Sequence, residues 1–316
     1  MRPVDIEMNE ADGKPSEKKL QDNKLTEAAA SGLFPIRELS QQTGVNSVTL
    51  RAWERRYGLL KPKRTTKGHR LYDHSHIVRV EAILKWIQQG VAVSKVRALL
   101  DQGNEEDSIA PILSSDSEWQ EFRIQLIQAA QMMNETKIEQ LYRQVFSQYP
   151  ADIAIRDWLL PSLERMNKGA SLSFVEAVLT ACLLDRVSNL KGQQKKAQKS
   201  VLILGLSNQK LLWGYLAAAI FLDKGVRCQV VMSCANTFEW SSLVESLEAN
   251  TILAFCENDL SSRAEDLMVE MAAWQQHTVA LGAGFWLATR DSKQVERVKV
   301  VSEVWDGVQT CLSLIQ

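Results

Sequence analysis

The last third of the chain alternates short apolar segments with longer helical ones, and this alternation restricts its fold more than any other feature. Five segments have the length and the Val, Ile and Leu content of buried strands: VLILGL (201–206), CQVVM (228–232), ILAFC (252–256), TVALG (278–282) and RVKVV (297–301). Helical patterns occupy 209–223, 237–249, 262–276 and 306–315. Strands that alternate with helices of this length form a parallel sheet covered on both faces. We therefore expect a doubly wound, flavodoxin-like α/β domain at 198–316.

Composition divides the rest of the chain into four segments. Residues 1–32 are polar and poor in aromatic residues, which is typical of a disordered tail. Residues 33–102 are basic and compact in pattern, and the polar stretch 103–118 after them is the best candidate for a linker. Between 119 and 192, apolar residues recur at helical spacing, which predicts a bundle of about four antiparallel helices. The expected protein is therefore multidomain.

The charge of the chain is unevenly distributed. The whole sequence is nearly neutral, with 37 Lys and Arg against 38 Asp and Glu. Between residues 35 and 100, however, 13 basic residues stand against 4 acidic ones, a net charge of +9. Such an excess on one small segment predicts that it binds a polyanion.

Neither a membrane span nor a signal core is visible in the sequence. No apolar run approaches the ~18 residues that a bilayer requires, and the first residues lack an apolar core. We therefore expect a cytoplasmic protein that does not contact membranes.

The basic segment contains the pattern of a helix-turn-helix. Pro35 suits the first turn of a helix that runs to about Gln42, and Gly44 permits a tight left-handed turn. A second helix is expected from Ser47 to Tyr57. In this motif the second helix enters the major groove, and its first residues meet base edges.

The side chains of this second helix suggest two kinds of contact with double-stranded DNA. The short polar residues at its start are expected to read bases: Asn46, Ser47 and Thr49. The arginines further along are expected to grip phosphates, which gives affinity without sequence preference: Arg51, Arg55 and Arg56.

A basic hairpin follows this helix. The stretch LLKPKRTTKGHRLY combines turn-forming residues with many cations, the composition of a wing that lies along the DNA backbone. Its expected contact residues are Lys61, Lys63, Arg64, Lys67, His69 and Arg70.

These residues carry a specific resemblance. The run LSQQTGVNSVTLRAWERRYGLL followed by GHRLY resembles the N-terminal winged-helix domain of MerR-family transcription regulators, over about 66 residues without a gap. The resemblance implies a homodimer on a palindromic operator, contact with RNA polymerase at the promoter, and activation more than repression. It also implies that the duplex is held by Arg51, Trp53, Arg55, Arg56, Tyr57, Arg70 and Tyr72. Trp53 has a second interpretation, as a core residue beside Leu50.

The order of the three domains resembles the cobalamin-dependent, light-responsive branch of this family. That branch holds the corrin through D-x-H-x-x-G, whose histidine ligates cobalt, and W-x9-E-H in the bundle. In this sequence the first motif falls on Gln209, Leu211 and Gly214, so a leucine without a lone pair replaces the ligand. The second motif falls on Met166, Glu176 and Ala177, so only the glutamate remains.

No histidine of the chain is expected to replace the missing ligand. The chain has four: His69, His74 and His76 belong to the wing region, and His277 precedes the strand at 278–282. Ligands of an open parallel sheet gather at the carboxyl ends of its strands, the edge opposite His277. The sequence therefore predicts neither a cofactor nor a metal. The turn LGAGF resembles a loop that accepts the nucleotide tail of cobalamin, but one G-x-G is a weak signal.

These residues bear on three candidate functions. The first is a cobalamin-independent transcription regulator, most consistent with an activator, whose C-terminal domains serve dimerisation, partner contact or an unidentified signal. The alternative is a cobalamin-dependent light-responsive repressor with an atypical lower ligand. An enzyme is not expected, because residues 119–316 lack a phosphate loop, a nucleophile with its base, and a metal cluster.

Overall fold

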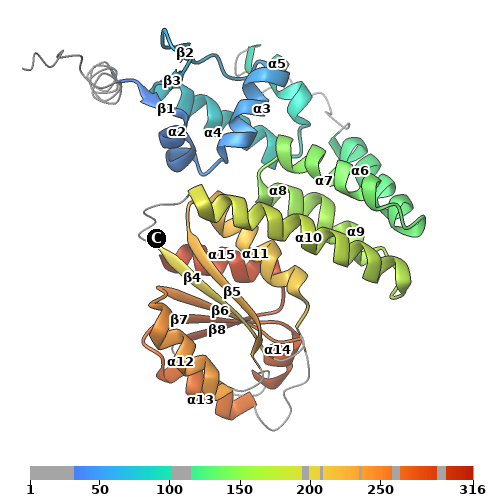
Figure 1. Ribbon diagram of the computed structural model, residues 1–316, viewed down its shortest axis with the longest axis vertical. Helices are drawn as coiled ribbons and strands as arrows, with labels where there is room; N and C mark the ends of the chain where they lie inside the picture. Colours follow the sequence, from blue (N-terminus) through green and yellow to red (C-terminus); the bar gives the residue numbers. More distant parts are fainter. Residues whose placement is uncertain are drawn as a thin grey trace, which may run out of the picture.

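The computed structural model describes residues 32–101, 115–193, 199–206, 209–234, 237–257, 264–289 and 297–315. These residues form three parts, which follow one another from top to bottom in Figure 1: a basic part (32–101), a bundle (115–193) and an α/β part (199–315). The expected tail up to residue 31 and the expected linker from 103 to 114 lie outside the described ranges, whereas the last four residues of that linker, 115–118, are helical.

The basic part is a winged helix-turn-helix. Its helices are α2 (Ile36–Thr43), α3 (Ser47–Tyr57), α4 (His74–Gln88) and α5 (Val93–Asp101). Its strands are β1 (Phe34–Pro35), β2 (Lys63–Arg64) and β3 (Arg70–Tyr72), which pair antiparallel in the order β1-β3-β2. The predicted second helix, Ser47 to Tyr57, is therefore confirmed, and the predicted hairpin is the pair of β2 and β3.

The bundle contains four helices, the third of which is irregular. Three are α6 (Ser115–Gln131), α7 (Glu135–Gln148) and α10 (Ala170–Gln193). The third helix in chain order consists of α8 (Ala151–Ala154), the π-helical turn η1 (Ile155–Leu159) and α9 (Leu160–Glu164).

Pro161 explains this irregularity. Proline has no N–H, so the carbonyl oxygen of Asp157, four residues earlier, cannot accept the usual α-helical hydrogen bond from residue 161. The guanidinium of Arg123 on α6 donates to that oxygen instead, from Nε at 2.8 Å and Nη2 at 2.6 Å. The sequence pattern, which predicts one regular helix here, does not show this widened turn.

The α/β part is a doubly wound domain with a five-stranded parallel sheet. Its strands are β4 (Ser200–Leu206), β5 (Arg227–Cys234), β6 (Thr251–Phe255), β7 (His277–Leu281) and β8 (Val298–Val301), in the order β5-β4-β6-β7-β8. Its helices are α11 (Leu211–Asp223), α12 (Thr237–Leu247), α13 (Ala264–Ala273), α14 (Ala283–Thr289) and α15 (Val304–Ile315). Helices α11 and α15 cover one face, and α12 and α13 cover the other (Figure 1). The predicted flavodoxin-like fold is confirmed.

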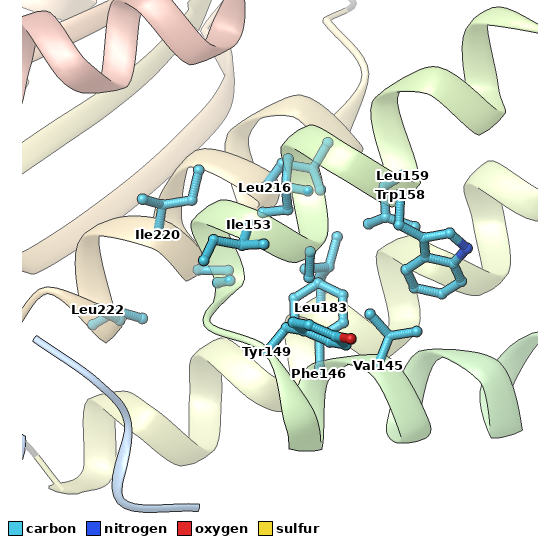
Figure 2. Close-up of a cluster of buried hydrophobic side chains, with 14 of the residues drawn as sticks. Val145, Phe146, Tyr149, Ile153, Trp158, Leu159, Leu183, Leu216, Ile220 and Leu222 are labelled. Atoms are coloured by element: carbon cyan, nitrogen blue, oxygen red, sulfur yellow. The ribbon is translucent and has the colours of Figure 1, made fainter. Parts of the chain in front are cut away.

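The two faces of the sheet contact different apolar clusters. Alternate residues of β4 separate accordingly: Val201 and Ile203 join one cluster, and Leu202 and Leu204 join the other. The first cluster continues through α11 into the bundle and the basic part. Figure 2 shows this junction, where Leu216 and Ile220 of α11 approach the aromatic residues of α7. Because α11 packs between the sheet and the bundle, it is apolar on nearly every side.

Candidate DNA-binding surface

Two left-handed glycines and one side-chain cap define the start and end of α3. Gly44 ends α2 at a φ of 65°, and Gly58 ends α3 at 61°. Asn46 caps the first turn of α3, because its Oδ1 accepts a hydrogen bond from the backbone N–H of Val48 at 2.8 Å. This local chemistry is what makes the helix-turn-helix readable in the sequence.

Along α3, the exposed face carries cations. Arg55 and Arg56 are exposed, and Arg51 is half-buried on the same helix. Ser47 and Tyr57, at the two ends, are half-buried as well. Burial raises the pKa of the Tyr57 hydroxyl, so it stays neutral near neutral pH.

The wing adds a second group of exposed cations. Its turn closes where the N–H of Gly68 donates to the carbonyl oxygen of Thr65 at 2.8 Å. The predicted contact residues around this turn are exposed: Lys61, Lys63, Arg64, Lys67 and His69. The structure thus brings these side chains and the arginines of α3 into one part of the fold.

Glu54 joins the wing to α3. Its carboxylate pairs with Arg64 at 2.6 Å and with Arg70, whose guanidinium is mostly buried. The hydrogen bond from Arg70 to Glu54 raises the pKa of the guanidinium above its usual value. The charge of Arg70 is therefore compensated by the carboxylate of Glu54 within the protein. The sequence pattern does not identify Glu54 as the partner of the wing arginines, although an acidic residue in so basic a helix is a visible signal.

Four residues predicted to hold the duplex are buried in this arrangement: Asn46, Thr49, Trp53 and Tyr72. Trp53 Nε1 donates to the backbone oxygen of Gln148, at the end of α7, at 2.8 Å. Burial raises the pKa of Tyr72 to about 12. For Asn46 and Trp53 the physical reason is contact with the α/β part and the bundle, which the sequence does not encode locally, whereas Tyr72 on β3 lies among residues of the basic part. The core interpretation of Trp53 agrees with this position.

In the α/β part, the positions of the first corrin motif serve packing. Gln209 is buried, and its Oε1 accepts from the N–H of Glu257 at 3.1 Å. Leu211 begins α11 and is 47% exposed. Gly214 lets α11 approach β5, because a Cβ there would lie 2.6 Å from Sδ of Met232.

The positions of the second motif lie on the bundle side. Met166 is half-buried and Ala177 is exposed. Glu176 receives two hydrogen bonds from Nζ of Lys210, at 2.7 and 2.9 Å. The sequence analysis did not single out Lys210, and nothing local signals that its partner lies on α10.

These residues do not fit cobalamin. His277 is exposed at the first position of β7, opposite the carboxyl ends of the strands, as predicted. Leu211 offers no donor atom, and its neighbour Lys210 forms an ion pair with Glu176, a position of the second motif. Within the described ranges, no three His, Cys, Asp or Glu residues group as metal ligands.

The two glycines of LGAGF do not form one loop, which corrects that interpretation. Gly282 is the turn residue, at a φ of 114°, and a Cβ there would lie 2.4 Å from the carbonyl oxygen of Cys256. Gly284 lies inside α14, and its N–H donates to the same oxygen at 3.0 Å.

None of the helices in the described ranges has the length and apolar character needed to cross a bilayer.

Known proteins resemble this chain over most of its length. A family model described as MerR HTH family regulatory protein matches residues 34–103. The HTH-type transcriptional regulator MlrA of Escherichia coli (strain K12) is 30% identical over 247 residues, which cover 77% of this chain and 95% of MlrA. The HTH-type transcriptional repressor CarH of Myxococcus xanthus is 26% identical over 170 residues, 51% of this chain and 57% of CarH.

One solved structure also shows a distant likeness. It is a cobalamin-binding protein from Desulfitobacterium hafniense DCB-2, with 13% identity, a TM-score of 0.35, and coverage of 61% of this chain and 98% of that one. A likeness of this size carries no argument.

Proposed function

Because the chain belongs to the MerR family of helix-turn-helix transcriptional regulators, we propose that it is a sequence-specific activator that works without cobalamin. The observation that carries this proposal is the exposed group of cations on α3 and the wing, next to an α/β part whose corrin positions do not fit a corrin. The similarity to transcription regulators supports a non-enzymatic role.

On this proposal, phosphates are contacted by the exposed cations Arg55, Arg56, Lys61, Lys63, Arg64, Lys67 and His69, with Arg51 and Tyr57 beside them. Each cation that neutralises a phosphate contributes affinity that salt removes. Ser47 reads bases from the start of α3, and Asn46 and Thr49 join it once the contacts that bury them open. Trp53, Arg70 and Tyr72 support α3 and the wing from within.

Dimerisation and promoter contact complete the proposal. A MerR-type reader on a palindrome acts as a homodimer and contacts RNA polymerase, in the cytoplasm. The segments 33–102, 119–192 and 198–316 are proposed as the DNA-binding, bundle and α/β domains, joined by a linker at 103–118. The last two domains serve dimerisation, partner contact or an unidentified signal.

Salt dependence tests DNA binding. We expect purified protein to bind promoter DNA with a logarithm of affinity that falls linearly with the logarithm of salt, by ~0.9 for each neutralised phosphate. An affinity that is flat across salt contradicts the proposal. Mapping the bound sites across a genome then identifies the operators, and transcription from them with and without the protein separates an activator from a repressor.

Light absorption tests cobalamin independence. Protein incubated with adenosylcobalamin in the dark and then desalted is expected to show no corrin band. A stoichiometric band that light removes supports the alternative instead, a light-responsive repressor.

A further inference from the structure

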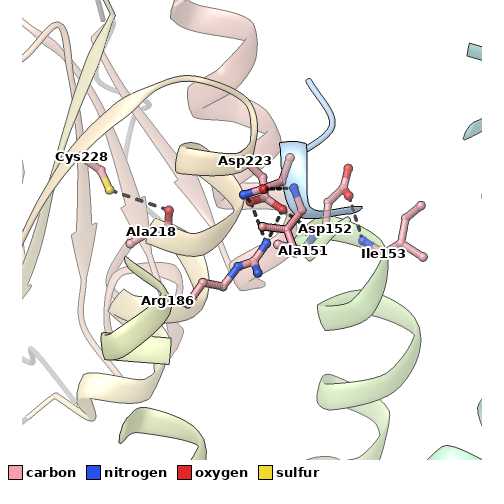
Figure 3. Close-up of polar contacts among 9 residues, drawn as sticks. Ala151, Asp152, Ile153, Arg186, Ala218, Asp223 and Cys228 are labelled. Carbon is pink, nitrogen blue, oxygen red and sulfur yellow. Dashed lines mark hydrogen bonds and ion pairs between the residues drawn. The ribbon is translucent and has the colours of Figure 1, made fainter. Parts of the chain in front are cut away.

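A buried carboxylate joins all three parts of the chain at one point. Asp223, the last residue of α11, is buried, and Arg186 Nη2 on α10 donates to its two oxygens at 2.8 and 2.9 Å. The N–H of Ala151, which begins α8, donates to Oδ2 at 2.9 Å (Figure 3). Asn46 Nδ2, at the start of α3, donates to Oδ1 at 3.3 Å.

These contacts differ in strength. A buried carboxylate needs a compensating charge, and Arg186 supplies it from the bundle. Charge-assisted bonds are also shorter and stronger than bonds from neutral donors. The bond from Asn46 is long and its donor is neutral, so it is the weakest of the set.

The same asymmetry holds around this point. Lys224 Nζ, on the α/β part, pairs with Asp152 Oδ2 of the bundle at 2.9 Å. Helix α3 of the basic part, in contrast, bonds to neutral acceptors of the bundle: Trp53 Nε1 donates to the Gln148 backbone oxygen at 2.8 Å, and Arg56 Nη1 donates to Oγ of Ser147 at 3.4 Å. Three ion pairs therefore join the bundle to the α/β part, the third being Lys210 with Glu176. The bonds of α3 at this junction have a neutral donor or a neutral acceptor, so α3 is the element that we expect to separate most easily.

We propose that Asn46, Trp53, Gln148 and Asp223 form a latch that holds the start of α3 against the rest of the protein and opens when the protein engages DNA. This inference rests on the proposed DNA-binding function. With the latch closed, the cations of the wing and Arg55 reach a duplex, but Asn46 and Thr49 do not. With the latch open, the start of α3 enters the groove and adds phosphate and base contacts. Any change in the α/β part that shifts Asp223 then alters the fraction of open protein.

Asn46→Ser in the full chain tests the latch. Serine keeps the helix cap, but its side chain is too short to reach Asp223. The matched control is Asn134→Ser at the exposed cap of α7, where Oδ1 of Asn134 accepts from the N–H of Lys137 at 3.0 Å. The probe is a fluorescein-labelled duplex of random sequence, so the loss of a base reader does not affect the result.

Loss of one bond to a carboxylate shifts a two-state equilibrium by roughly tenfold. We therefore expect Asn46→Ser to bind the random duplex about fivefold to tenfold more tightly than the unmodified chain, with a steeper salt dependence. The control is expected to stay within about twofold. Asn46→Ser binding no more tightly than the control overturns the latch.

Trp53→Phe and hydrogen exchange provide a second test that needs no DNA. The phenylalanine retains most of the apolar contact but cannot donate to Gln148. Faster amide exchange in the segments 47–53 and 148–153, in both latch variants and not in the control, supports the latch, and unchanged exchange overturns it. If no variant binds the duplex, the DNA-binding proposal fails, while the exchange result still decides the latch. Thermal melts show whether each variant folds. If Trp53→Phe does not fold, the results for Asn46→Ser alone test the latch.

Discussion

The carboxylate of Glu54 on α3 lies 2.6 Å from the guanidinium of Arg64 in the wing, and it also pairs with Arg70. The carboxylate of Glu54 therefore holds the wing against α3, and the cations of the wing add to those of this helix. Because Glu54 is largely buried by these partners, its loss leaves the mostly buried Arg70 without a counter-charge.

Glu54→Gln is expected to lower the free energy of unfolding by about 1–2 kcal/mol, because glutamine accepts a hydrogen bond but carries no charge. The matched control is Glu139→Gln, which breaks an exposed pair with Arg143 on α7. An exposed pair of this kind contributes about 0.5 kcal/mol or less. Urea unfolding measures both, and equal losses for the two variants contradict the role of Glu54.

Arg55→Ala is expected to weaken binding to every duplex to a similar extent and to reduce the salt slope by ~0.9, because we propose that this exposed arginine on α3 contacts phosphate. Fluorescence anisotropy on several unrelated duplexes measures this. Lys299→Ala, which removes an exposed cation from β8, is the control and is expected to change neither quantity. A loss confined to one sequence identifies Arg55 as a base reader instead.

Thr49→Val probes a hydroxyl that is buried without a hydrogen-bond partner among the described residues. Valine has nearly the same shape, so removing the unsatisfied oxygen is expected to raise the free energy of unfolding by about 1 kcal/mol. If Thr49 also reads bases after the latch opens, the variant shows an altered base preference in selection from random duplexes. Lower stability would show that the hydroxyl has a partner in the folded protein.

Glu118 gives a dependence of stability on pH. Burial raises the pKa of its carboxyl, and the hydroxyl of Tyr149, which donates to Oε2 at 3.3 Å, only partly offsets this. An acid whose pKa is higher in the folded state binds more protons when folded, so ionisation lowers stability as pH rises above the unfolded value. Glu118→Gln is therefore expected to stabilise the protein at about pH 7 and to have little effect at about pH 4.

The control for this prediction is Glu121→Gln, an exposed position on the same helix. Denaturant unfolding at the two pH values is the measurement. A gain at Glu118 that is the same at both values would mean that its charge is not the cause.

Restoring the first corrin motif with Gln209→Asp and Leu211→His is expected to give weak corrin binding at most. The ion pair between Lys210, which precedes α11, and Glu176 of α10 remains, and Met166 and Ala177 still lack the aromatic ring and the imidazole of the second motif. Absorbance after desalting is the measurement. A stoichiometric corrin band in the double variant would show that the ion pair leaves room for the ligand.

The features that the sequence predicts correctly are set by residues that lie close together in the chain. The ends of α3 follow from Gly44, Gly58 and the cap at Asn46, which act within a few residues. The sheet follows from strands that are apolar throughout because both faces are covered. The mismatch of Leu211 with a metal ligand follows from its chemistry alone.

Contacts between distant segments account for what the sequence did not predict. Asn46 and Asp223 are 177 residues apart, and no local pattern shows that the cap of one helix is also a donor to the end of another. Lys210 and Glu176 are likewise far apart in the sequence, and no local pattern shows that they form an ion pair. The widened turn before Pro161 is different, because the proline is visible in the sequence but the helical spacing of the bundle does not specify a π-helical turn.

The apolar cluster that runs from Leu39 to Cys311 passes through all three parts of the protein. A fragment cut after residue 101 would leave Trp53 facing water where α7 had covered it, and Tyr149 would lose the N–H of Val93, which donates to its hydroxyl at 3.5 Å. Such a fragment would expose the indole of Trp53 to water, so we expect it to be less stable than the same residues within the intact chain. Its behaviour on DNA is therefore expected to differ from that of the intact chain.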